Sequence, residues 1–225
     1  MTVLRGIWIS LGWLWAVAAM AQPTLEPDLN WDLRRERDGI VVYTARVPDS
    51  PHAAVLSSTI IENVRLSALV ALIQDAPACA EWAPQCAASH VHELISDTEA
   101  LVYTHNDLPF PVRDRDVLAR VRWQQDTDSL AVSMHSQATV GILPETDDKL
   151  RLTEARATWR FTPLGDGRVE VANFAHINPG SSLPGWVNNM LLVDTPYEML
   201  KSLVTAVQDS RYAQASISFV REPAQ

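Results

Sequence analysis

The stretch "LPGWVNNMLLVDTPYEMLKSLVTAVQDSRY", residues 183–212, decides the fold because it predicts one long amphipathic helix near the C-terminus. Its apolar residues recur at alternating spacings of four and three, which is the period of one face of an α-helix. That face comprises Trp186, Met190, Val193, Tyr197, Leu200, Val204 and Val207. Pro196 lies inside the segment and should kink the helix, because proline removes one donor from the helical hydrogen-bond ladder.

The region before this helix alternates apolar and polar residues, which is the pattern of half-buried strands. The expected strands cover residues 40–47, 53–63, 89–96, 99–107, 115–124, 130–140, 151–164 and 168–178. Short turns separate them, so strands that follow one another should pair antiparallel. Helices are expected over residues 28–39, where Gly39 would end the helix, over 64–76 and within 77–85. The pattern predicts the α+β class with an eight-stranded antiparallel sheet.

The expected inner face of this sheet carries several small and hydroxyl-bearing residues instead of Leu and Ile. Ala119, Ser136 and Ala175 are examples. Such a face favours a curved sheet that wraps around the C-terminal helix and leaves a hydrophobic cavity between them. A filled core with a few hydrogen-bonded polar groups would give the same pattern, so the residues alone leave both possibilities open.

The N-terminus has the features of a secretory signal peptide over residues 1–21. One basic residue, Arg5, precedes an uncharged apolar run over residues 6–17, and "AMA" ends at Ala21 as a cleavage pattern. A membrane anchor is the alternative, but the run is shorter than the roughly 20 residues that a spanning helix needs. The residue directly after the cleavage pattern is Gln22 and not a cysteine, which argues against a lipoprotein. We expect a periplasmic or secreted protein.

Length and charge limit the remaining possibilities. The 225 residues, 47% of them hydrophobic, favour one domain over residues 22–225. We also expect a monomer. The formal net charge of -9 argues against a nucleic-acid partner, because phosphate binding needs clustered Lys and Arg.

Cys79 and Cys86 are the two cysteines of the chain, and export changes how they are interpreted. In an oxidising compartment two thiols favour a disulfide over a metal pair or a nucleophile. Seven positions on one continuous helix would hold the two Cα atoms about 10 Å apart, too far for a disulfide. Pro84 disfavours such a helix and lets the chain turn back, and two buried free thiols are the alternative.

Several segments, in this order and spacing, resemble the START domain, a lipid-transfer branch of the helix-grip superfamily. They are "RDGIVVYTARV" (37–47), "LIQDAPACAEWAPQC" (72–86), "YTHNDLPFPVRDRDVLARV" (103–121), "TWRFTPLGDGRVEV" (158–171) and "INPGSSLPGWVNNM" (177–190). The resemblance covers residues 28–211. It implies a curved sheet that grips the C-terminal helix, with a hydrophobic tunnel for one lipid-like ligand between them.

The resemblance also implies which residues form the ligand site. The tunnel wall would comprise Ala119, Val121, Trp123, Met134, Ser136, Trp159 and Asn173 from the sheet, and Trp186, Met190, Val193 and Tyr197 from the helix. A movable lid would comprise Leu108, Pro109, Phe110, Pro111, Arg113 and Arg115. The acidic and basic cavity pair of the sterol-binding branch has no counterpart, because Arg120 and Arg122 fall on the outer face of their strand.

The charged repeat "RDRD", residues 113–116, is interpreted as a latch for this lid. Arg113 or Arg115 would pair with Asp114, Asp116 or neighbouring carbonyls at the surface and pin the loop to its strand. Surface pairs of this kind contribute roughly 0–1 kcal/mol each, so their value would lie in placing the loop.

No nucleophile elbow, phosphate loop or zinc pattern occurs in the sequence, so we expect no enzyme activity, no cofactor and no metal. His90 with His92 offers two ligands without a third, and His105 with Asp107 is a possible acid–base pair. His135 and His176 are candidate hydrogen-bonding groups of the cavity, although ordinary structural roles account for all of these residues.

We therefore expect a non-catalytic carrier of a lipid or other hydrophobic small molecule that makes transient membrane contact. Two alternatives remain. One is an enzyme like the polyketide cyclases and aromatases of the same superfamily, which the signal peptide disfavours because carrier-bound polyketides are cytoplasmic. The other is a groove that binds a peptide or a partner segment.

Overall fold

The computed structural model describes residue 25 and residues 28–224. The predicted signal peptide and its cleavage site lie outside the described residues. The strands are β1 (Trp31–Arg37), β2 (Ile40–Arg46), β3 (Ala53–Ile61), β4 (Cys86–Ser96), β5 (Glu99–Asn106), β6 (Asp114–Gln125), β7 (Val132–Ala138), β8 (Lys149–Arg151), β9 (Ala155–Gly165) and β10 (Arg168–Ile177). The helices are α1 (Leu66–Gln74), the 3₁₀ turn η1 (Ala76–Ala78), α2 (Cys79–Trp82), α3 (Gly185–Asn189), the π-helical turn η2 (Met190–Asp194), α4 (Thr195–Ala206) and α5 (Ser210–Ala213).

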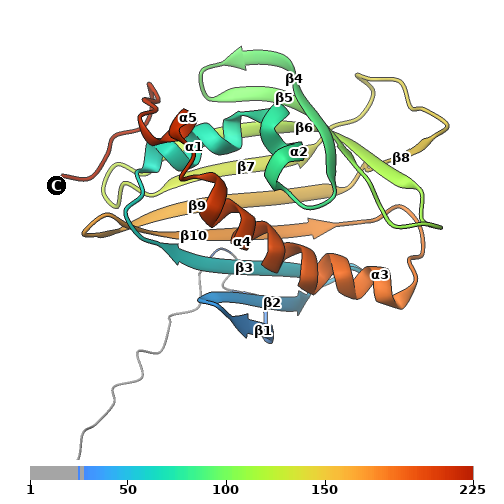
Figure 1. Ribbon diagram of the computed structural model, residues 1–225. Helices are drawn as coiled ribbons and strands as arrows, with labels where there is room; N and C mark the ends of the chain where they lie inside the picture. The colour runs from blue at the N-terminus through green and yellow to red at the C-terminus, as the bar shows by residue number, and fades with distance from the viewer. Residues whose placement is uncertain (1–24, 26–27, 225) are drawn as a thin grey trace, which may run out of the picture.

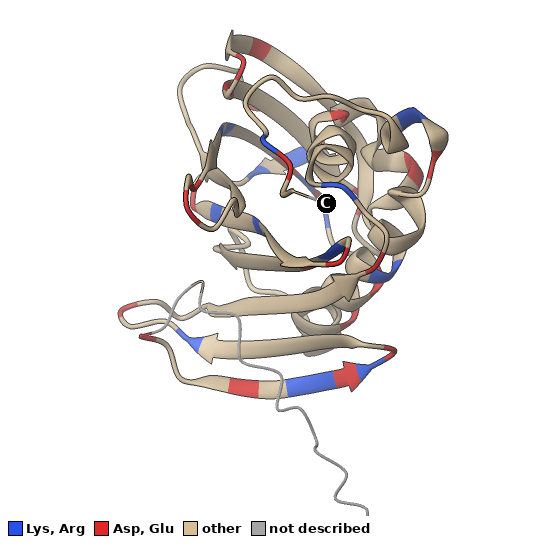
Figure 2. Cartoon of the chain, turned by 90° about the vertical axis from the view of Figure 1, so that its left-hand side faces the viewer, with Lys and Arg blue, Asp and Glu red and all other residues tan. Residues whose placement is uncertain are grey.

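The expected α+β architecture is confirmed, with one curved sheet and the C-terminal helix on its inner side (Figure 1). The strand order is β1-β2-β3-β10-β9-β7-β6-β5-β4, and every neighbouring pair in this order is antiparallel. The short strand β8 pairs parallel with the start of β6. In the view turned by 90°, the sheet curls around the helices (Figure 2).

The prediction of a helix over residues 28–39 is wrong, because this segment forms strand β1 and a hairpin turn to β2. Arg37 pairs with Ile40, so Asp38 and Gly39 make up the two-residue connection. Both residues have positive φ, 53° and 74°, as hairpin turns of the Asp-Gly type require. Gly39 therefore closes a hairpin instead of ending a helix.

The C-terminal helix is continuous through Pro196, but it is not a uniform α-helix. The π turn η2 lies between α3 and α4, and Pro196 falls in the first turn of α4. Proline has no backbone N–H to donate. In the first turn of α4, directly after a π turn, this N–H would not have had an ordinary α-helical acceptor, so its absence costs little. The expected disruption thus takes the form of a π turn before the proline.

The main core lies between the inner face of the sheet and the helices α1 and α4. Leu66 and Leu69 of α1, Leu200 and Leu203 of α4, and Phe161 of β9 are fully buried in it. Here α4 packs against β2 and β3, and α1 packs against β9. Within the described part of the chain, no helix is long and apolar enough to cross a membrane.

Candidate ligand-binding cavity

A cavity of about 1070 Å³ occupies the space between the inner face of the sheet and the helices. Strands β3 to β7, β9 and β10 contribute one wall, and α2, η2 and α4 contribute the other. Its volume lies at the upper end of the usual range for small-molecule pockets, and aliphatic and aromatic side chains dominate its wall. The space can therefore accommodate a large apolar ligand.

All seven sheet residues that the resemblance implied line this cavity. They are Ala119, Val121, Trp123, Met134, Ser136, Trp159 and Asn173. The strand register explains why they meet, because Trp123 pairs with Met134, Met134 with Trp159, and Trp159 with Asn173. Directly paired residues point to the same face of a sheet, so these four form one row across β6, β7, β9 and β10.

The helix face that the sequence predicted for the cavity is corrected by the structure. Trp186, Met190, Val193 and Tyr197 do not line the cavity, whereas Asn188, Leu191, Leu192, Thr195, Pro196 and Met199 do. Trp186 is 55% exposed, and Tyr197 is buried where its hydroxyl donates to Asp38 at 2.6 Å. Val193, Tyr197, Leu200 and Val207 of the predicted face are buried, so this face packs on the core. The cavity-lining residues lie about two positions further along, on another side of the helix.

The loop between β5 and β6, residues 107–113, covers one end of the cavity, which we call the lid end. Of the predicted lid residues, Leu108 and Arg115 line the cavity, whereas Phe110 points to solvent with 93% exposure. Pro109, Pro111 and Arg113 lie outside the cavity lining. The Leu108 backbone N–H donates to the Asp114 carboxylate at 3.1 Å, which holds the loop against the start of β6.

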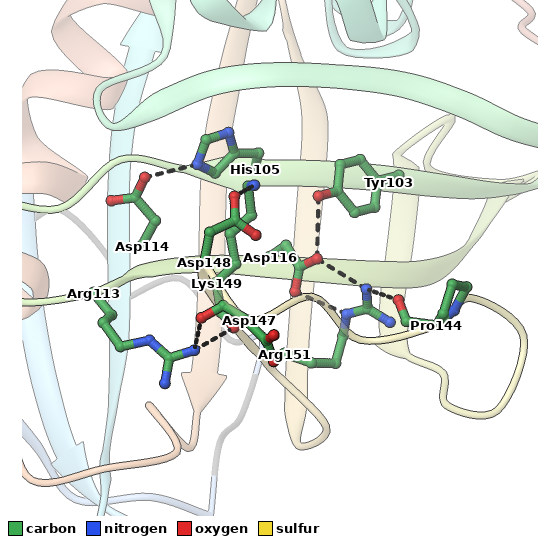
Figure 3. Close-up of polar contacts among 10 residues, drawn as sticks. All are labelled: Tyr103, His105, Arg113, Asp114, Asp116, Pro144, Asp147, Asp148, Lys149 and Arg151. Carbon is green, nitrogen blue, oxygen red and sulfur yellow. Dashed lines mark hydrogen bonds and ion pairs between the residues drawn. The ribbon is translucent and has the colours of Figure 1, made fainter.

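The "RDRD" charges hold this end together, but not by pairing with one another as predicted. His105 and Asp114 are 2.9 Å apart, and Asp116 accepts two hydrogen bonds from Arg151 at 2.8 Å each (Figure 3). Arg113 donates to the carbonyls of Asp147 and Lys149. The expectation that neighbouring carbonyls are the partners is therefore met for Arg113. The acid–base pairing of His105 with Asp107 is wrong, because Asp114 is the partner.

The pairs are also less exposed than a surface latch would be. Asp116 is 1% exposed, and it accepts a further hydrogen bond from the Tyr103 hydroxyl at 3.1 Å. The hydrogen bonds from Arg151, more than any other contact, hold the pKa of Asp116 below its ordinary value. The contact with His105 lowers the pKa of Asp114 in the same way. Because both side chains of the Asp116–Arg151 pair are almost fully buried, removing one of them would leave an uncompensated buried charge between β6 and β8.

Arg115 points the other way, into the cavity side of β6, and is 4% exposed. Its guanidinium donates to the carbonyl oxygens of Arg113 and Pro179 and to the Ser181 hydroxyl at 3.0 Å. These contacts join the lid loop to residues 178–184, the segment that leads into α3. Burial, more than the nearby Arg113, lowers the pKa of Arg115.

The segment before α3 depends on a glycine. Gly180 has a φ of +76°, a conformation that side chains with a Cβ rarely adopt, and its N–H donates to the Asn178 side chain at 2.9 Å. A Cβ at this position would also meet the Leu150 side chain of β8. The sequence "NPGSS" therefore places Pro179 and Ser181 against Arg115 through a turn that requires glycine.

Cys79 and Cys86 form a disulfide beside the lid end. The bond connects α2 to the first residue of β4, and both residues line the cavity. The chain turns back between them because Gln85 adopts a positive φ of 60° just after Pro84. The disulfide therefore holds α2 in place over the cavity.

The opposite end, which we call the tail end, is closed by residues 214–222, a segment beyond the predicted core. Ile217 and Phe219 line the cavity, and the ring centroids of Phe219 and Trp123 are 6.1 Å apart. The Glu222 carboxylate accepts hydrogen bonds from the N–H groups of Leu66 and Ser67 at the start of α1. The apolar run "ISFV" at residues 217–220 was the sequence signal for this role.

The carboxylates of Asp75 and Asp97 lie on the cavity side near this segment, whereas that of the neighbouring Glu99 turns to the outer face with Arg120 and Arg122. Asp75 accepts from the Tyr212 hydroxyl at 2.9 Å, and Asp97 from the Ser218 hydroxyl at 3.2 Å. Burial, reinforced by Asp75, raises the pKa of Tyr212 to about 12. Glu99 pairs with Arg120 and Arg122, and the hydrogen bond from Arg120 lowers its pKa most.

Three buried polar atoms in cavity-lining residues have no hydrogen-bond partner within the described part of the chain. They are Trp82 Nε1, Gln85 Oε1 and Thr195 Oγ1. Buried polar atoms normally find partners, so each of these indicates a place where a bound molecule or water completes the structure.

The remaining sequence candidates do not gather into a second chemical site. His135 contacts Gln124 and Thr158 on the outer face of the sheet, and His176 contacts Ser50, so neither lines the cavity. The ring of His90 lies 5.1 Å from that of Tyr103. Among the described residues, no three His, Cys, Asp or Glu side chains gather as a metal site would require. Arg120 and Arg122 border a polar hollow of about 350 Å³ on the outer face.

Comparison with known proteins adds three similarities. The chain is 30% identical over 193 residues to an uncharacterized protein of Pseudomonas aeruginosa, covering 86% of this chain and 93% of that protein. It is 25% identical over 198 residues to the phosphatidylcholine transfer protein of Bos taurus, covering 86% and 91%. The crystal structure of a STAR-related lipid transfer protein from Xanthomonas axonopodis superposes with a TM-score of 0.72 and 30% identity, covering 80% of this chain and 99% of that chain.

The model of one protein family also matches most of the chain. It is the START domain, and the match extends over residues 16–212. The curved antiparallel sheet, the C-terminal helix and the cavity between them fit this assignment. The chain belongs to the START domain family.

Proposed function

We propose that this protein binds a lipid or another hydrophobic ligand in its cavity and carries it between membranes without changing it chemically. The observation that carries the proposal is the cavity of about 1070 Å³ with its largely apolar wall. The cavity shields the acyl chains of a lipid from water during transfer, and burial of each CH₂ group stabilises the bound state by about 0.8 kcal/mol. The three unpartnered polar atoms of Trp82, Gln85 and Thr195 support a ligand that has polar groups as well as chains.

The similar proteins support the same class of ligand. One is named for the transfer of phosphatidylcholine and another for lipid transfer. We take from them an amphiphilic lipid as the class of ligand for this chain.

We also propose that the lid end meets the membrane. Large apolar residues are exposed in the segments at this end, and aromatic side chains favour the boundary between lipid and water. They are Phe110 in the lid loop, Val140 and Ile142 after β7, and Trp186 at the start of α3. A lid whose tip enters the membrane would allow the ligand to leave without crossing water.

The proposed place of action is the periplasm or the extracellular space. The predicted signal peptide supports export, and a disulfide between Cys79 and Cys86 fits an oxidising compartment.

The test is the mass of the protein purified from its own compartment, measured in the native state and after denaturation. A ligand in the cavity adds a mass that denaturation removes. Val121→Trp places a large ring inside the cavity and should lower the bound fraction, whereas Arg122→Trp places the same ring on the outer face and should not. A protein that carries no ligand and takes up no fatty acid, phospholipid or sterol would contradict the proposal.

A further inference from the structure

The charged side chains of the cavity are unevenly distributed. Among the described residues that line it, the charged ones are Asp75, Asp97, Glu99 and Arg115. Arg115 pairs with Asn106 where β5 ends, and Glu99 pairs with Arg122, seven positions further along β6. At the rise of an extended strand, seven positions correspond to about 23 Å. Arg115 therefore lies at the opposite end of the cavity from Asp97 and Glu99, and the Glu99 carboxylate turns to the outer face with Arg120 and Arg122.

The carboxylates already have partners. Asp75 and Asp97 accept hydrogen bonds from Tyr212 and Ser218, and Glu99 is paired with two arginines. These carboxylates therefore require no hydrogen-bond donor or cation from a ligand.

Arg115 differs because, among the described residues, no carboxylate lies within ion-pair distance of its guanidinium, and the nearest acid, Asp114, acts on its charge only from the other face of the strand. Its acceptors are two backbone carbonyls and one hydroxyl, all of them neutral. The acids on either side of it, Asp114 and Asp116, point to the opposite face of β6, as the alternation of a strand requires. There they are held by His105 and Arg151 (Figure 3).

A buried guanidinium without a carboxylate is unusual, because buried charges are normally paired. Two of its contacts are also long, since Nε and Nη2 both lie 3.4 Å from the Pro179 carbonyl oxygen. Charge-assisted hydrogen bonds to an anion are shorter and about twice as strong as bonds between neutral groups. An anion at this position would therefore be favoured over the present neutral contacts.

We propose that Arg115 binds the anionic headgroup of an amphiphilic ligand, a carboxylate or a phosphate, at the lid end of the cavity. The ligand's chain then lies along the inner face of β6 towards Trp123 and the tail end. This inference rests on the proposed function and names the charge of the ligand that the cavity selects.

The test compares two ligands that share a chain and differ in charge, palmitate and hexadecanol, added to delipidated mature protein at mildly alkaline pH. Binding is followed by displacement of a fluorescent fatty acid. The wild-type protein should bind palmitate at least about tenfold more tightly than hexadecanol, the preference expected for one hydrogen-bonded charge pair. Arg115→Gln should remove this preference and leave the affinity for hexadecanol within about twofold of the wild-type value.

Two further variants separate charge recognition from loop positioning. Arg115→Lys keeps the charge and should keep part of the preference, and Arg122→Gln removes a charge from the outer face of the same strand and should keep all of it. Equal loss of both ligands in Arg115→Gln would show that Arg115 only joins the two loops and would overturn the inference. If Arg115→Gln does not fold, the wild-type preference and Arg115→Lys still decide.

The failures of the two proposals are distinguishable. If the wild-type protein binds neither ligand, the proposed function fails. If it binds both with equal affinity, the carrier function stands and the assignment of Arg115 is overturned. Inorganic phosphate has the headgroup's charge but no chain, so it should not displace palmitate, and displacement by phosphate alone would contradict an amphiphile as the ligand.

Discussion

The lid end and the tail end of the cavity are built from different interactions. At the lid end, hydrogen bonds of Arg115 join the lid loop to residues 178–184, while the buried Asp116–Arg151 pair joins β6 to β8. At the tail end, Phe219 packs near Trp123, and Glu222 binds the first N–H groups of α1. Loop hydrogen bonds can be exchanged for bonds to water at small net cost, whereas separating apolar surfaces is costly. The difference supports our proposal that the ligand enters at the lid end and that the tail end stays closed.

The largest expected effect comes from the buried ion pair at the lid end. Asp116→Asn leaves the Arg151 guanidinium without its counter-charge, because both side chains are almost fully buried. We expect a loss of roughly 3–5 kcal/mol in the free energy of unfolding, measured by urea denaturation. Asp148→Asn removes a carboxylate that is 67% exposed, so the loss of its pair with Lys149 should lower the free energy of unfolding far less. Equal losses in the two variants would contradict this account of the lid end.

The same variant makes a prediction about pH. The folded-state pKa of Asp116 is lowered, so its contribution is present above the pKa of about 3.9 of an unfolded aspartate and is lost as the pH falls through the folded-state value. The stability difference between the wild-type protein and Asp116→Asn should therefore shrink below about pH 4. A difference that stays constant across this range would show that Asp116 acts by some means other than its charge.

Removal of the tail should have the next largest effect. A chain that ends at Ala213 loses the packing of Phe219 and the contact of Glu222 with α1. We expect a loss of about 3 kcal/mol and a melting temperature lower by about 6–12 °C. A chain that ends at Glu222 keeps both contacts and should melt like the full chain. If both truncations melt alike, residues 214–222 do not close the cavity.

Loss of the disulfide should have a smaller effect. The double variant Cys79→Ser, Cys86→Ser frees α2 from β4 at the lid end. For so short a loop we expect a loss of about 2–3 kcal/mol in the free energy of unfolding. Reducing agent should lower the stability of the wild-type protein by the same amount and leave the double variant unchanged. A reductant-sensitive double variant would rule out this explanation.

The smallest effect on stability is expected at the tip of the lid. Phe110 is 93% exposed, so Phe110→Ala should change the free energy of unfolding by less than about 0.5 kcal/mol. It should nevertheless slow ligand transfer between vesicles, because the ring is proposed to enter the membrane. Leu33→Ala removes an exposed apolar side chain from β1, at one edge of the sheet, and should not slow transfer. Equal transfer rates for Phe110→Ala and the wild-type protein would contradict membrane docking through the lid.

The sheet was predictable because its side-chain period is strict. Once residues 115–124 and 130–140 were assigned as strands, alternation placed Val121 and Ser136 on one face, and the register now pairs them directly. The helix face was not predictable in the same way. The apolar spacing identified the side of the helix that is buried, and Tyr197 and Leu200 do pack in the core, but the spacing does not indicate which other side borders the cavity.

Two other features depended on partners that the sequence does not name. Asp38 and Gly39 suit either the end of a helix or a hairpin turn, and the pairing of β1 with β2 decides between them. Arg115 could have paired with either neighbouring aspartate, but strand alternation and the positions of His105 and Arg151 direct those acids away from it. The sequence therefore could not indicate that Arg115 faces the cavity without a paired carboxylate, because this depends on the partners of both aspartates.

The central claim is that the lid end opens for the ligand while the tail end stays closed. Hydrogen–deuterium exchange during ligand uptake tests this claim most directly, because it follows both ends of the cavity in one sample. Delipidated protein is mixed with vesicles and labelled at successive times. We predict that exchange changes in residues 107–113 and 179–186 as ligand enters, while residues 214–222 and the start of α1 keep the same protection throughout. Opening of residues 214–222 with an unchanged lid would contradict the account.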